Sequence, residues 1–358
     1  MRMFVVSSPF MMHVAQCIIK KSKNMNNILY SWYVPNNKKH IQSYEIQKNE
    51  DYWKKIIHSD KGDLFIHLTI KNIFLYRNLL KKNAMEIKKI LESNGATEVI
   101  IGNRYSPIDR QIYHVCRDLG ISCSLLEDGL RSYINENKVI KKDYKYIIKK
   151  FIKKIIFREM YFLYDEEYEL IFESIYTVLP EKYSIDNYKG ELKEIDLNII
   201  DNDKIAKLIN FDENKNRALF LSQCISEDRE VSVEQEIKLL ENFIVNNIDK
   251  FDEIIIKFHP RDSKNKQNII INKINTLGLD VKILDLGVDI PLELIIKELN
   301  INYLVGFYTS SLFYMKKIDS SINVISLLKS LTEVPSCSTR IKNIYMEVYN
   351  TFDDIVYK

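Results

Sequence analysis

The chain has 358 residues, of which 46% are hydrophobic and 28% charged, a profile that excludes disordered and fibrous proteins and is long enough for two domains. The net charge of +3 excludes a strong overall attraction to polyanions, so any such role must rest on local patches. The opening "MRMFVVSSPF" is too short an apolar run for a signal peptide, and we find no apolar stretch of about eighteen residues that would predict a membrane span. The five cysteines are scattered, form no CxxC or metal-ligand pair, and indicate reduced core thiols in a cytoplasmic protein: Cys17, Cys116, Cys123, Cys224 and Cys337.

Short apolar runs alternate with amphipathic ones from the first residue. In the first half the pattern predicts strands at 3–6, 27–34, 63–69, 97–103 and 122–129, and helices at 9–23, 72–94 and 107–119. After residue 200 it predicts strands at 217–224, 252–258, 281–286, 302–308 and 323–328, with helices at 233–247, at 264–277, from Pro291 and from Ser310.

Two successive β-α-β series predict an α/β protein with two parallel sheets, each covered by helices on both faces. We expect Rossmann-like domains at 1–200 and 201–358, joined within 180–215 around Pro180. The last helix is expected to cross back toward the first domain.

The stretch "IIIKFHPRD" ends an apolar run at a histidine followed by a proline. Ile254, Ile255 and Ile256 predict a buried strand that is apolar on both faces, as parallel sheets require. Pro260 cannot donate to a sheet ladder, so the strand must end before it. His259 is therefore expected at the carboxyl end of a central strand, where open α/β sheets bind ligands, although a histidine that only ends a strand fits equally well.

Two further motifs lie at predicted strand ends. "CSLLEDG" ends in Glu127, Asp128 and Gly129, and adjacent carboxylates before a glycine indicate either an acid/base pair or a solvated turn. "NYLVGFYTSSLFYM" ends a strand and opens a helix at Thr-Ser-Ser, residues 309–311. Hydroxyls and free backbone N–H groups at a helix start favour a phosphate, although ordinary N-capping explains them equally well.

In this order the three motifs resemble those of the bacterial sialyltransferases, with family 52 of the glycosyltransferases and the bacterial polysialyltransferases as the nearer relatives. Here they are Glu127-Asp128-Gly129, His259-Pro260 and Ser310-Ser311. The opening "VVSSPFMMHVAQ" is similar to the first strand, loop and helix of these enzymes. The similarity in layout spans most of the chain, whereas only the short motifs carry it residue by residue.

The resemblance implies a GT-B architecture, in which the two domains face a central cleft, and CMP-sialic acid as the donor. It also implies inversion at the anomeric carbon and no metal or other cofactor. In such an enzyme Asp128 or Glu127 is the base that takes the acceptor proton, and His259 stabilises the departing phosphate. The other residues expected to bind the donor are Pro260, Thr309, Ser310, Ser311, Gly129, Ser222, Gln223 and Ser226.

The loop "LSQCISEDRE" offers a second acidic pair, Glu227 and Asp228, because the resemblance to family 52 also allows an acid after the first strand of the second domain. The same strand end carries carbonyls and hydroxyls that would contact cytosine or ribose. A plain helix N-cap at Ser226 or Ser232 competes with this interpretation.

The stretch "IKKDYKYIIKKFIKKIIFRE" predicts a strongly amphipathic basic helix over 141–158. One face carries Tyr144, Ile147, Ile148, Phe151, Ile152, Ile155 and Ile156, and the other carries Lys141, Lys142, Lys145, Lys149, Lys150, Lys153 and Lys154. The pattern fits a core-packed helix with a solvated lysine face, contact with an anionic membrane surface, or contact with a polyanionic acceptor glycan. No nucleic-acid motif accompanies the patch, so nucleic acid is not an expected partner.

One motif argues for a different chemistry. Residues 201–203, Asp-Asn-Asp, form a DxD pattern of the kind that holds a metal in GT-A enzymes. They precede a predicted helix at the domain join, where aspartates commonly cap, and we interpret the pattern as chance.

We therefore expect a cytoplasmic sialyltransferase, peripheral on the inner face of the cell membrane, that acts on lipooligosaccharide or capsule. The alternatives are a GT-B transferase with another nucleotide sugar, and a non-catalytic protein that binds anionic lipid or glycan. The acceptor, the linkage, polymerisation and a homodimer stay open.

Overall fold

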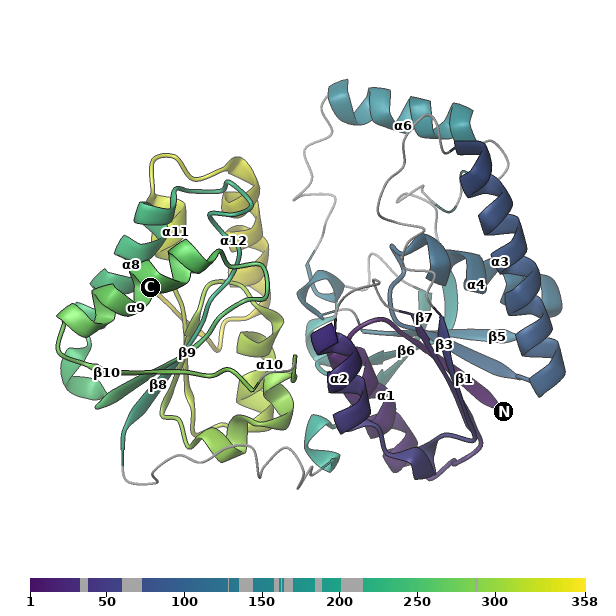
Figure 1. Ribbon diagram of the computed structural model, residues 1–358, viewed down its shortest axis with the longest axis horizontal. Helices are drawn as coiled ribbons and strands as arrows, with labels where there is room; N and C mark the ends of the chain where they lie inside the picture. Colours follow the sequence, from purple (N-terminus) through teal and green to yellow (C-terminus); the bar gives the residue numbers. More distant parts are fainter. Residues whose placement is uncertain are drawn as a thin grey trace. The chain divides into compact units, whose positions relative to one another are not determined.

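The computed structural model describes residues 1–32, 38–59, 73–127, 129–134, 144–157, 161, 163, 170–183, 189–200, 215–286 and 289–358. Contacts divide the chain into two compact units (Figure 1). Unit 1 comprises Met1–Asp128 and Lys142–Asp201, and unit 2 comprises Gly129–Lys141 and Asn202–Lys358. The division near residue 201 lies within the expected join, but the segment that begins at Gly129 groups with unit 2 and not with the residues before it.

Unit 1 contains a seven-stranded sheet whose neighbouring strands are all parallel, in the order β3-β2-β1-β4-β5-β6-β7. The strands are β1 Arg2–Val6, β2 Asn27–Trp32, β3 Lys55–Ser59, β4 Glu98–Ile101, β5 Ser122–Leu126, β6 Ile171–Thr177 and β7 Lys189–Glu194. The direction in which strands are added reverses between β1 and β4. In such sheets, ligands bind outside the carboxyl ends at the reversal.

Helices connect these strands: α1 Pro9–Ser22, α2 Lys38–Gln47, α3 Ile73–Asn94, α4 Pro107–Leu119 and α6 Tyr144–Phe157, with single 3-10 turns at Glu50–Tyr52, Pro180–Lys182 and Leu197–Ile199. The sequence explains where α1 and α4 begin. Ser8 and Ser106 accept hydrogen bonds from the first turn, and a proline follows each of them at the first helical position. Gly120 ends α4 with a φ of 66°, in the left-handed region that glycine favours.

Unit 2 contains a six-stranded parallel sheet in the order β10-β9-β8-β11-β12-β13, with the reversal between β8 and β11. Its strands are β8 Arg217–Leu221, β9 Glu253–Lys257, β10 Asp280–Ile283, β11 Tyr303–Gly306, β12 Asn323–Ser326 and β13 Val356–Tyr357. Its helices are α8 Val233–Val245, α9 Lys264–Thr276, α10 Ser310–Ile318, α11 Leu328–Glu333 and α12 Thr339–Thr351, with 3-10 turns at Gly129–Ser132, Ile248–Lys250, Leu292–Leu294 and Ile296–Leu299.

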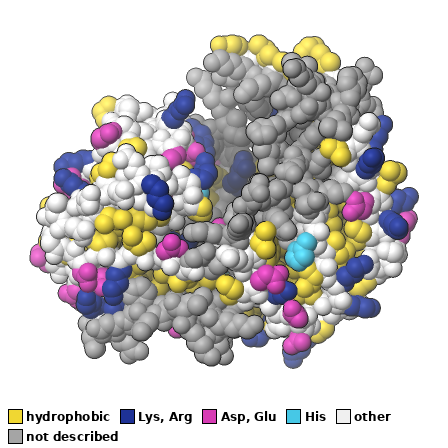
Figure 2. Space-filling model, in the orientation of Figure 1, with side chains coloured by type: hydrophobic (Ala, Val, Ile, Leu, Met, Phe, Trp, Pro, Cys, Tyr) yellow, Lys and Arg dark blue, Asp and Glu magenta, His cyan; other side chains and the backbone are white. Residues whose placement is uncertain are grey.

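Helix α6 turns its apolar face outward. Tyr144 is 68% exposed and Phe151 63%, and four isoleucines of the same face are also exposed. Figure 2 shows these side chains as a ridge of hydrophobic atoms along the upper edge of the view. The core-packed alternative, in which the lysine face is solvated and the apolar face buried, is therefore wrong.

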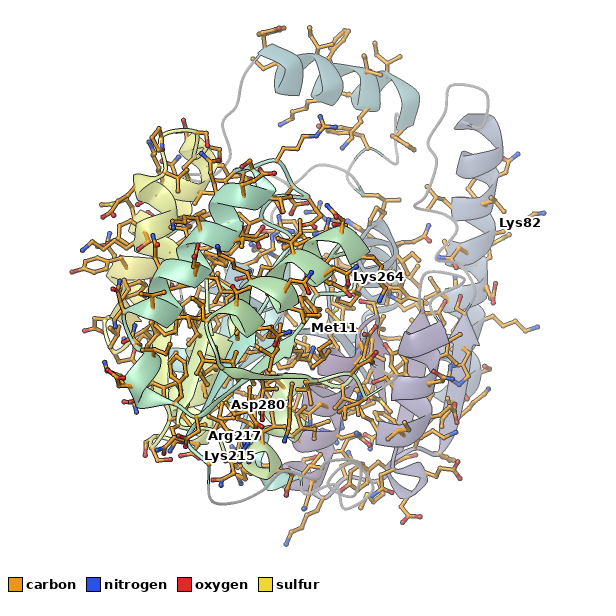
Figure 3. The ribbon with its side chains drawn as sticks, turned by 60° about the vertical axis from the view of Figure 1, so that its left-hand side comes forward. Met11, Lys82, Lys215, Arg217, Lys264 and Asp280 are labelled. Atoms are coloured by element: carbon orange, nitrogen blue, oxygen red, sulfur yellow. The ribbon has the colours of Figure 1, made fainter. Side chains whose placement is uncertain are left out.

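A network of charges closes the amino ends of β8, β9 and β10. Arg217 and Glu253 are fully buried and lie 2.6 Å apart, Lys282 contacts Glu253 at 3.0 Å, and Lys215 contacts Asp280 at 3.1 Å. Figure 3 shows Lys215, Arg217 and Asp280 together at this end of the unit. The opposite edge of the sheet, at the carboxyl ends, is the one that open α/β sheets use for ligands.

The structure corrects several sequence predictions. The strand expected at 63–69 lies outside the described residues, and the sequence analysis did not predict β3, β6, β7 and β13. Pro291 opens no α-helix, because two short 3-10 turns follow it. The last helix, α12, belongs to unit 2, where Phe352 after its end packs on Phe313 with ring centroids 4.4 Å apart and β13 pairs with β12. All five cysteines are free and buried, as predicted.

Candidate active site

A glutamine bridges the two strand ends at the reversal in the unit 2 sheet. Gln223 lies two residues past β8, and its Oε1 accepts hydrogen bonds from the backbone N–H groups of Phe307 at 3.1 Å and Tyr308 at 2.8 Å, which follow β11. Both lone pairs of this oxygen are used. Gln223 therefore fixes the two loops of the ligand-binding edge, and its Oε1 is not available to a nucleotide.

His259 lies two residues past β9, in a tight turn fixed by Asp262. The N–H of His259 donates to Oδ2 of Asp262 at 2.8 Å, and the N–H of Asp262 donates back to the carbonyl of His259 at 2.9 Å. Pro260 and Arg261 form the exposed corner of the turn. The strand ends at Lys257, so the prediction that the apolar run stops before the His-Pro pair is confirmed.

The geometry holds His259 as a neutral ring. Its Nδ1 lies 3.1 Å from the backbone N–H of Arg261 and 2.9 Å from Sγ of Cys224. The backbone group can only donate, and burial raises the pKa of Cys224 to about 11, so that group donates as a thiol. Burial also lowers the pKa of His259, with Asp262 opposing the shift and Arg261 and Lys257 supporting it. The ring proton is therefore on Nε2, which no described residue engages.

A buried lysine of α9 joins the loops after β8 and β9. Nζ of Lys266 lies 2.7 Å from the carbonyl oxygen of Gln223, 3.1 Å from Glu227, 3.0 Å from Asp262 and 2.7 Å from Glu236. Burial lowers the pKa of Lys266, but Glu236 and Asp262 outweigh it and the net shift is upward. The ammonium therefore stays charged and holds both loops.

The alternative acidic pair, Glu227 and Asp228, is engaged in ion pairs. Glu227 accepts hydrogen bonds from Lys266 and from the N–H of Ser263. Burial favours a higher pKa for Glu227, but these bonds outweigh it and its pKa lies below the ordinary value. Asp228 pairs with two nitrogens of Arg261, at 3.0 and 3.4 Å. The lowered pKa makes Glu227 a poor base, which argues against it.

Three potential metal ligands lie within 4.8 Å of one another, on Cys224, Glu227 and Asp262. Both carboxylates contact Nζ of Lys266, so an ammonium already supplies the positive charge at this point. No other group of this kind occurs in the part of the chain that the structure describes. The DxD pattern at 201–203 lies outside the described residues.

Helix α10 begins without a side-chain cap. Its N-cap, Thr309, is extended, and within the described part of the chain its side chain accepts no capping hydrogen bond. Serines do cap α1, α4, α8, α9 and α12, namely Ser8, Ser106, Ser232, Ser263 and Ser338. Ordinary N-capping is therefore wrong as an account of residues 309–311. The uncapped N–H groups and the positive end of the helix dipole are suited to an anion.

The segment after the predicted acidic pair approaches α10 closely. The N–H of Leu130 donates to Oγ of Ser310 at 2.9 Å. Gly129 has a φ of 73°, and a Cβ there would lie 2.5 Å from the same oxygen, so this position requires glycine. Tyr133 packs edge to face against Tyr314 of α10 with ring centroids 6.4 Å apart. The close backbone approach expected at Gly129 is thus made to a serine of the candidate phosphate site.

Glu127 is fully buried in unit 1. Its Oε2 accepts hydrogen bonds from the hydroxyl of Thr177 at 2.9 Å and from the N–H of Val178 at 2.6 Å, at the end of β6. A carboxylate in this position ties the end of β5 to the end of β6 and is not accessible to an acceptor. Asp128 lies outside the described residues, so its role as the base stays a prediction.

The serines that were predicted in and after the β8 loop make different hydrogen bonds. Ser226 donates its hydroxyl to Glu227 at 3.2 Å and its N–H to Glu236 at 3.1 Å, so it holds the loop and does not cap a helix. Ser232 is the N-cap of α8, as the capping interpretation predicted. The hydroxyl of Ser222 is buried and has no hydrogen-bond partner among the described residues.

Sequence reasoning missed Asp262, Lys266 and Glu293. The first two have the i,i+4 spacing of a helical ion pair, and this is the signal that could have identified them. Glu293 is a single acid in the apolar run "IPLELI" and is 8% exposed. Burial raises its pKa, while hydrogen bonds from its own N–H and from Ser311 and the charge of Lys257 oppose the shift. Glu293 therefore fixes the hydroxyl of Ser311.

Comparisons with known proteins agree with this arrangement. Residues 2–328 match the sequence model of the family described as Alpha-2,8-polysialyltransferase (POLYST). A search of curated protein sequences finds no significant match.

Solved structures share the fold at low sequence identity. UGT89C1 of Arabidopsis thaliana, complexed with UDP-L-rhamnose, has a TM-score of 0.52 at 10% identity over 99% of this chain and 84% of that chain. A UGT transferase from Siraitia grosvenorii in complex with UDP has a TM-score of 0.52 at 10% identity over 99% and 86%. The UDP-GlcNAc 2-epimerase from Methanocaldococcus jannaschii has a TM-score of 0.50 at 16% identity over 98% and 96%.

The two parallel-sheet units and these structural similarities confirm the predicted GT-B fold. The family match names the polysialyltransferases and not family 52. It covers nearly the whole chain and supports a sialyltransferase among the glycosyltransferases. The chain therefore belongs to the alpha-2,8-polysialyltransferase family.

Proposed function

We propose that the chain is an inverting, metal-independent enzyme that moves sialic acid from CMP-sialic acid to a hydroxyl of a bacterial surface glycan. The observation that carries the proposal is the uncapped start of α10 at the carboxyl edge of the unit 2 sheet, with Ser310 and Ser311 in its first turn. This is where an α/β sheet binds a nucleotide phosphate.

In the proposed reaction the bond between the anomeric carbon and the phosphate oxygen breaks, and CMP leaves with the electron pair. The N–H groups of α10, the hydroxyl of Ser310 and the Nε2–H of His259 stabilise the phosphate charge that develops. His259 acts as a neutral hydrogen-bond donor, because its pKa is lowered by burial and its Nδ1 accepts the hydrogen bond from the backbone N–H of Arg261.

The acceptor hydroxyl forms the new bond from the face opposite the leaving group, which inverts the configuration, and its proton passes to a carboxylate. We assign this base to Asp128. Glu127 is a positioning residue in this scheme, because its buried carboxylate fixes the strand end that precedes Asp128. A base of this kind is worth about 10²–10⁴ in rate.

The charge of Lys266 supports the metal-independent form of the proposal. The described ligand cluster of Cys224, Glu227 and Asp262 is organised around an ammonium group, so protein donors supply the stabilisation of the leaving phosphate. Activity that survives extensive chelation is the expected result, and loss of activity on chelation with recovery on adding a divalent ion would contradict it.

The family description supports a finer proposal for the acceptor and the linkage. Its α2,8 linkage joins one sialic acid to the next, so we propose a glycan that already ends in sialic acid as the acceptor. Incubation with CMP-sialic acid and a short sialylated oligosaccharide, followed by mass and linkage analysis, is expected to show a ladder of α2,8-linked products.

The decisive experiment compares donors and variants. The protein is expected to consume CMP-sialic acid and no member of a panel of UDP-sugars, and hydrolysis of a UDP-sugar alone would favour the alternative of another nucleotide-sugar transferase. His259→Ala is expected to lower turnover roughly 10²-fold with an unchanged fold. Asp128→Asn should remove most transfer and spare CMP binding, whereas Ser310→Ala with Ser311→Ala should weaken CMP binding in calorimetric titration. No turnover with any donor would favour a non-catalytic binding protein.

A further inference from the structure

The surface of α6 combines two features that rarely occur together on a solvent-exposed helix. Six large apolar side chains recur at helical spacing and all are about half or more exposed: Tyr144 68%, Ile147 62%, Ile148 53%, Phe151 63%, Ile152 49% and Ile155 59%. Phe157 at the end of the helix is fully buried. The helix therefore presents a continuous apolar stripe outward, while the side chain of Phe157 is packed (Figure 2).

The remaining surface of the helix is strongly positive. Tyr144–Phe157 contains five lysines and no acidic residue: Lys145, Lys149, Lys150, Lys153 and Lys154. At 100° per residue, positions 145 and 154 of the sequence fall at the two edges of the apolar stripe, and the other three lysine positions fall on the opposite face of the helix. Lys154 is exposed. The stripe thus lies between two rows of positive charge.

This pattern is typical of a helix that lies in the plane of a membrane surface. The 14 residues of α6 give a helix about 21 Å long, shorter than the roughly 30 Å hydrocarbon core of a bilayer. Within the described residues, no helix combines the length and apolarity that a membrane span needs. An apolar stripe between lysines places the side chains at the boundary of the acyl chains and the amines at the headgroups.

The charges and the apolar stripe together indicate which kind of binding partner could cover this face of α6. A polyanionic glycan would satisfy the lysines but would leave six apolar side chains in water. A second copy of α6 would cover the apolar stripe but would bring two lysine-flanked helices together, and like charges repel. An anionic lipid surface satisfies both features at once.

We propose that α6 anchors the protein reversibly to anionic membrane by inserting its apolar stripe at the interface. This goes beyond the proposed transferase activity, because it concerns a surface of unit 1 that needs no nucleotide or acceptor. Attachment depends on two contributions, so it weakens steeply with salt but retains a salt-resistant part.

Flotation of the full-length protein with vesicles tests the proposal. With vesicles of phosphatidylcholine containing one third phosphatidylglycerol, the protein is expected to float at low salt. Vesicles of phosphatidylcholine alone are expected to bind it roughly 10²-fold less, since several lysines contribute. Phe151→Ser with Ile155→Ser should lower the partition coefficient roughly 10²-fold. Lys154→Glu should lower it roughly 10-fold and reduce the salt dependence.

Matched changes elsewhere control for general effects on the surface. Val245→Ser with Met346→Ser removes two apolar side chains of similar exposure, 49% and 54%, from helices of unit 2. Lys329→Glu makes the same charge reversal on α11. These variants are expected to bind the vesicles as the wild type does, and an equal loss in them would overturn a specific role for α6.

A second copy of the chain or a glycan bound to α6 would give different experimental results. Lipid-free protein that sediments as a dimer, becomes monomeric with Phe151→Ser and Ile155→Ser, and does not float, would assign the stripe to a second copy. Protein that binds polysialic acid but not anionic vesicles, and loses this binding with Lys154→Glu alone, would assign the surface to a glycan. Either result contradicts the membrane proposal, and donor hydrolysis by the same samples shows whether the proposed activity stands independently.

Discussion

The carboxyl edges of the two sheets use buried polar residues in different ways. In unit 1, Glu127 binds the strand end after β6, and Asp109 accepts hydrogen bonds from the N–H groups of Gly102 and Asn103 and from Nε1 of Trp32. Both carboxylates accept hydrogen bonds that hold loops in place. In unit 2, side chains of α9 and of the β8 loop hold the loops. Other polar groups of that edge are left without partners among the described residues.

This difference distinguishes loop-fixing residues from candidate binding residues. Parallel sheets end in loops whose backbone N–H groups must be paired, so buried polar side chains occur at both edges. A binding edge keeps polar groups in addition to these. The hydroxyl of Ser59 at the end of β3 in unit 1 and the hydroxyl of Ser222 in unit 2 are both buried without a partner among the described residues, and unit 2 adds Nε2 of His259 and the first turn of α10. The loops of unit 2 are therefore prearranged for a ligand.

The largest expected effect comes from removing the charge at the centre of the unit 2 loops. Lys266→Met leaves three carboxylates without their cation and should lower the free energy of unfolding of unit 2 by about 3–5 kcal/mol. The two tryptophans, Trp32 and Trp53, both lie in unit 1, so their fluorescence reports that unit alone. In urea, the circular dichroism transition should move to lower concentration while the fluorescence transition stays in place.

Lys264→Met is the control for this change, because Lys264 lies on the same helix and is exposed. It should leave both transitions unchanged. A shift of both transitions with Lys266→Met would mean that the two units unfold together. Unfolding measurements could then not compare the loops of one unit with those of the other.

The matching change in unit 1 is Glu127→Ala. It removes a buried acceptor from the N–H of Val178 and from the hydroxyl of Thr177, which should cost about 2–3 kcal/mol. Here the tryptophan fluorescence transition should move and the unit 2 transition should not. Glu127→Gln keeps an acceptor oxygen and should restore much of the loss. If Glu127→Ala abolishes transfer without any change in unfolding, Glu127 itself acts in catalysis.

Gln223→Leu is expected to have a smaller effect on stability, about 1–3 kcal/mol, because two backbone N–H groups lose a shared acceptor. It should also weaken CMP binding roughly 10-fold by releasing the loop that leads to Ser310. Gln223→Glu keeps the acceptor and should restore stability. Calorimetric titration with CMP beside urea unfolding separates this positioning role from direct contact, since a direct contact would lower affinity with no change in stability.

The smallest expected effect is the pH dependence that His259 contributes. Its folded pKa is lowered, so below the ordinary value of 6.5 the unfolded state binds more protons than the folded state. Stability of unit 2 should therefore rise with pH through that window and be complete above it. His259→Asn should make the melting temperature depend less on pH between 5 and 7. A steeper dependence in the variant would show that the folded state favours the charged ring.

The sequence by itself determined the helices and strands whose ends are set by residues close to them in the chain. Pro260 ends β9 because it cannot donate to the ladder, and Ser8 and Ser106 begin helices because their hydroxyls accept from the first turn. The α/β pattern, the parallel sheets and the three motifs follow from such local signals. The amphipathic period of α6 was equally visible, but the period does not say which face meets solvent.

Tertiary structure alone decided what depends on residues that are distant in the chain. Lys266 contacts Gln223 across 43 residues, and Leu130 contacts Ser310 across 180, so no local pattern could show that these groups meet. The same is true of Glu127, which the sequence presents as a catalytic acid and the fold buries against β6. Whether a polar side chain fixes a loop or stays available to a ligand depends on partners that only the packed sheet supplies.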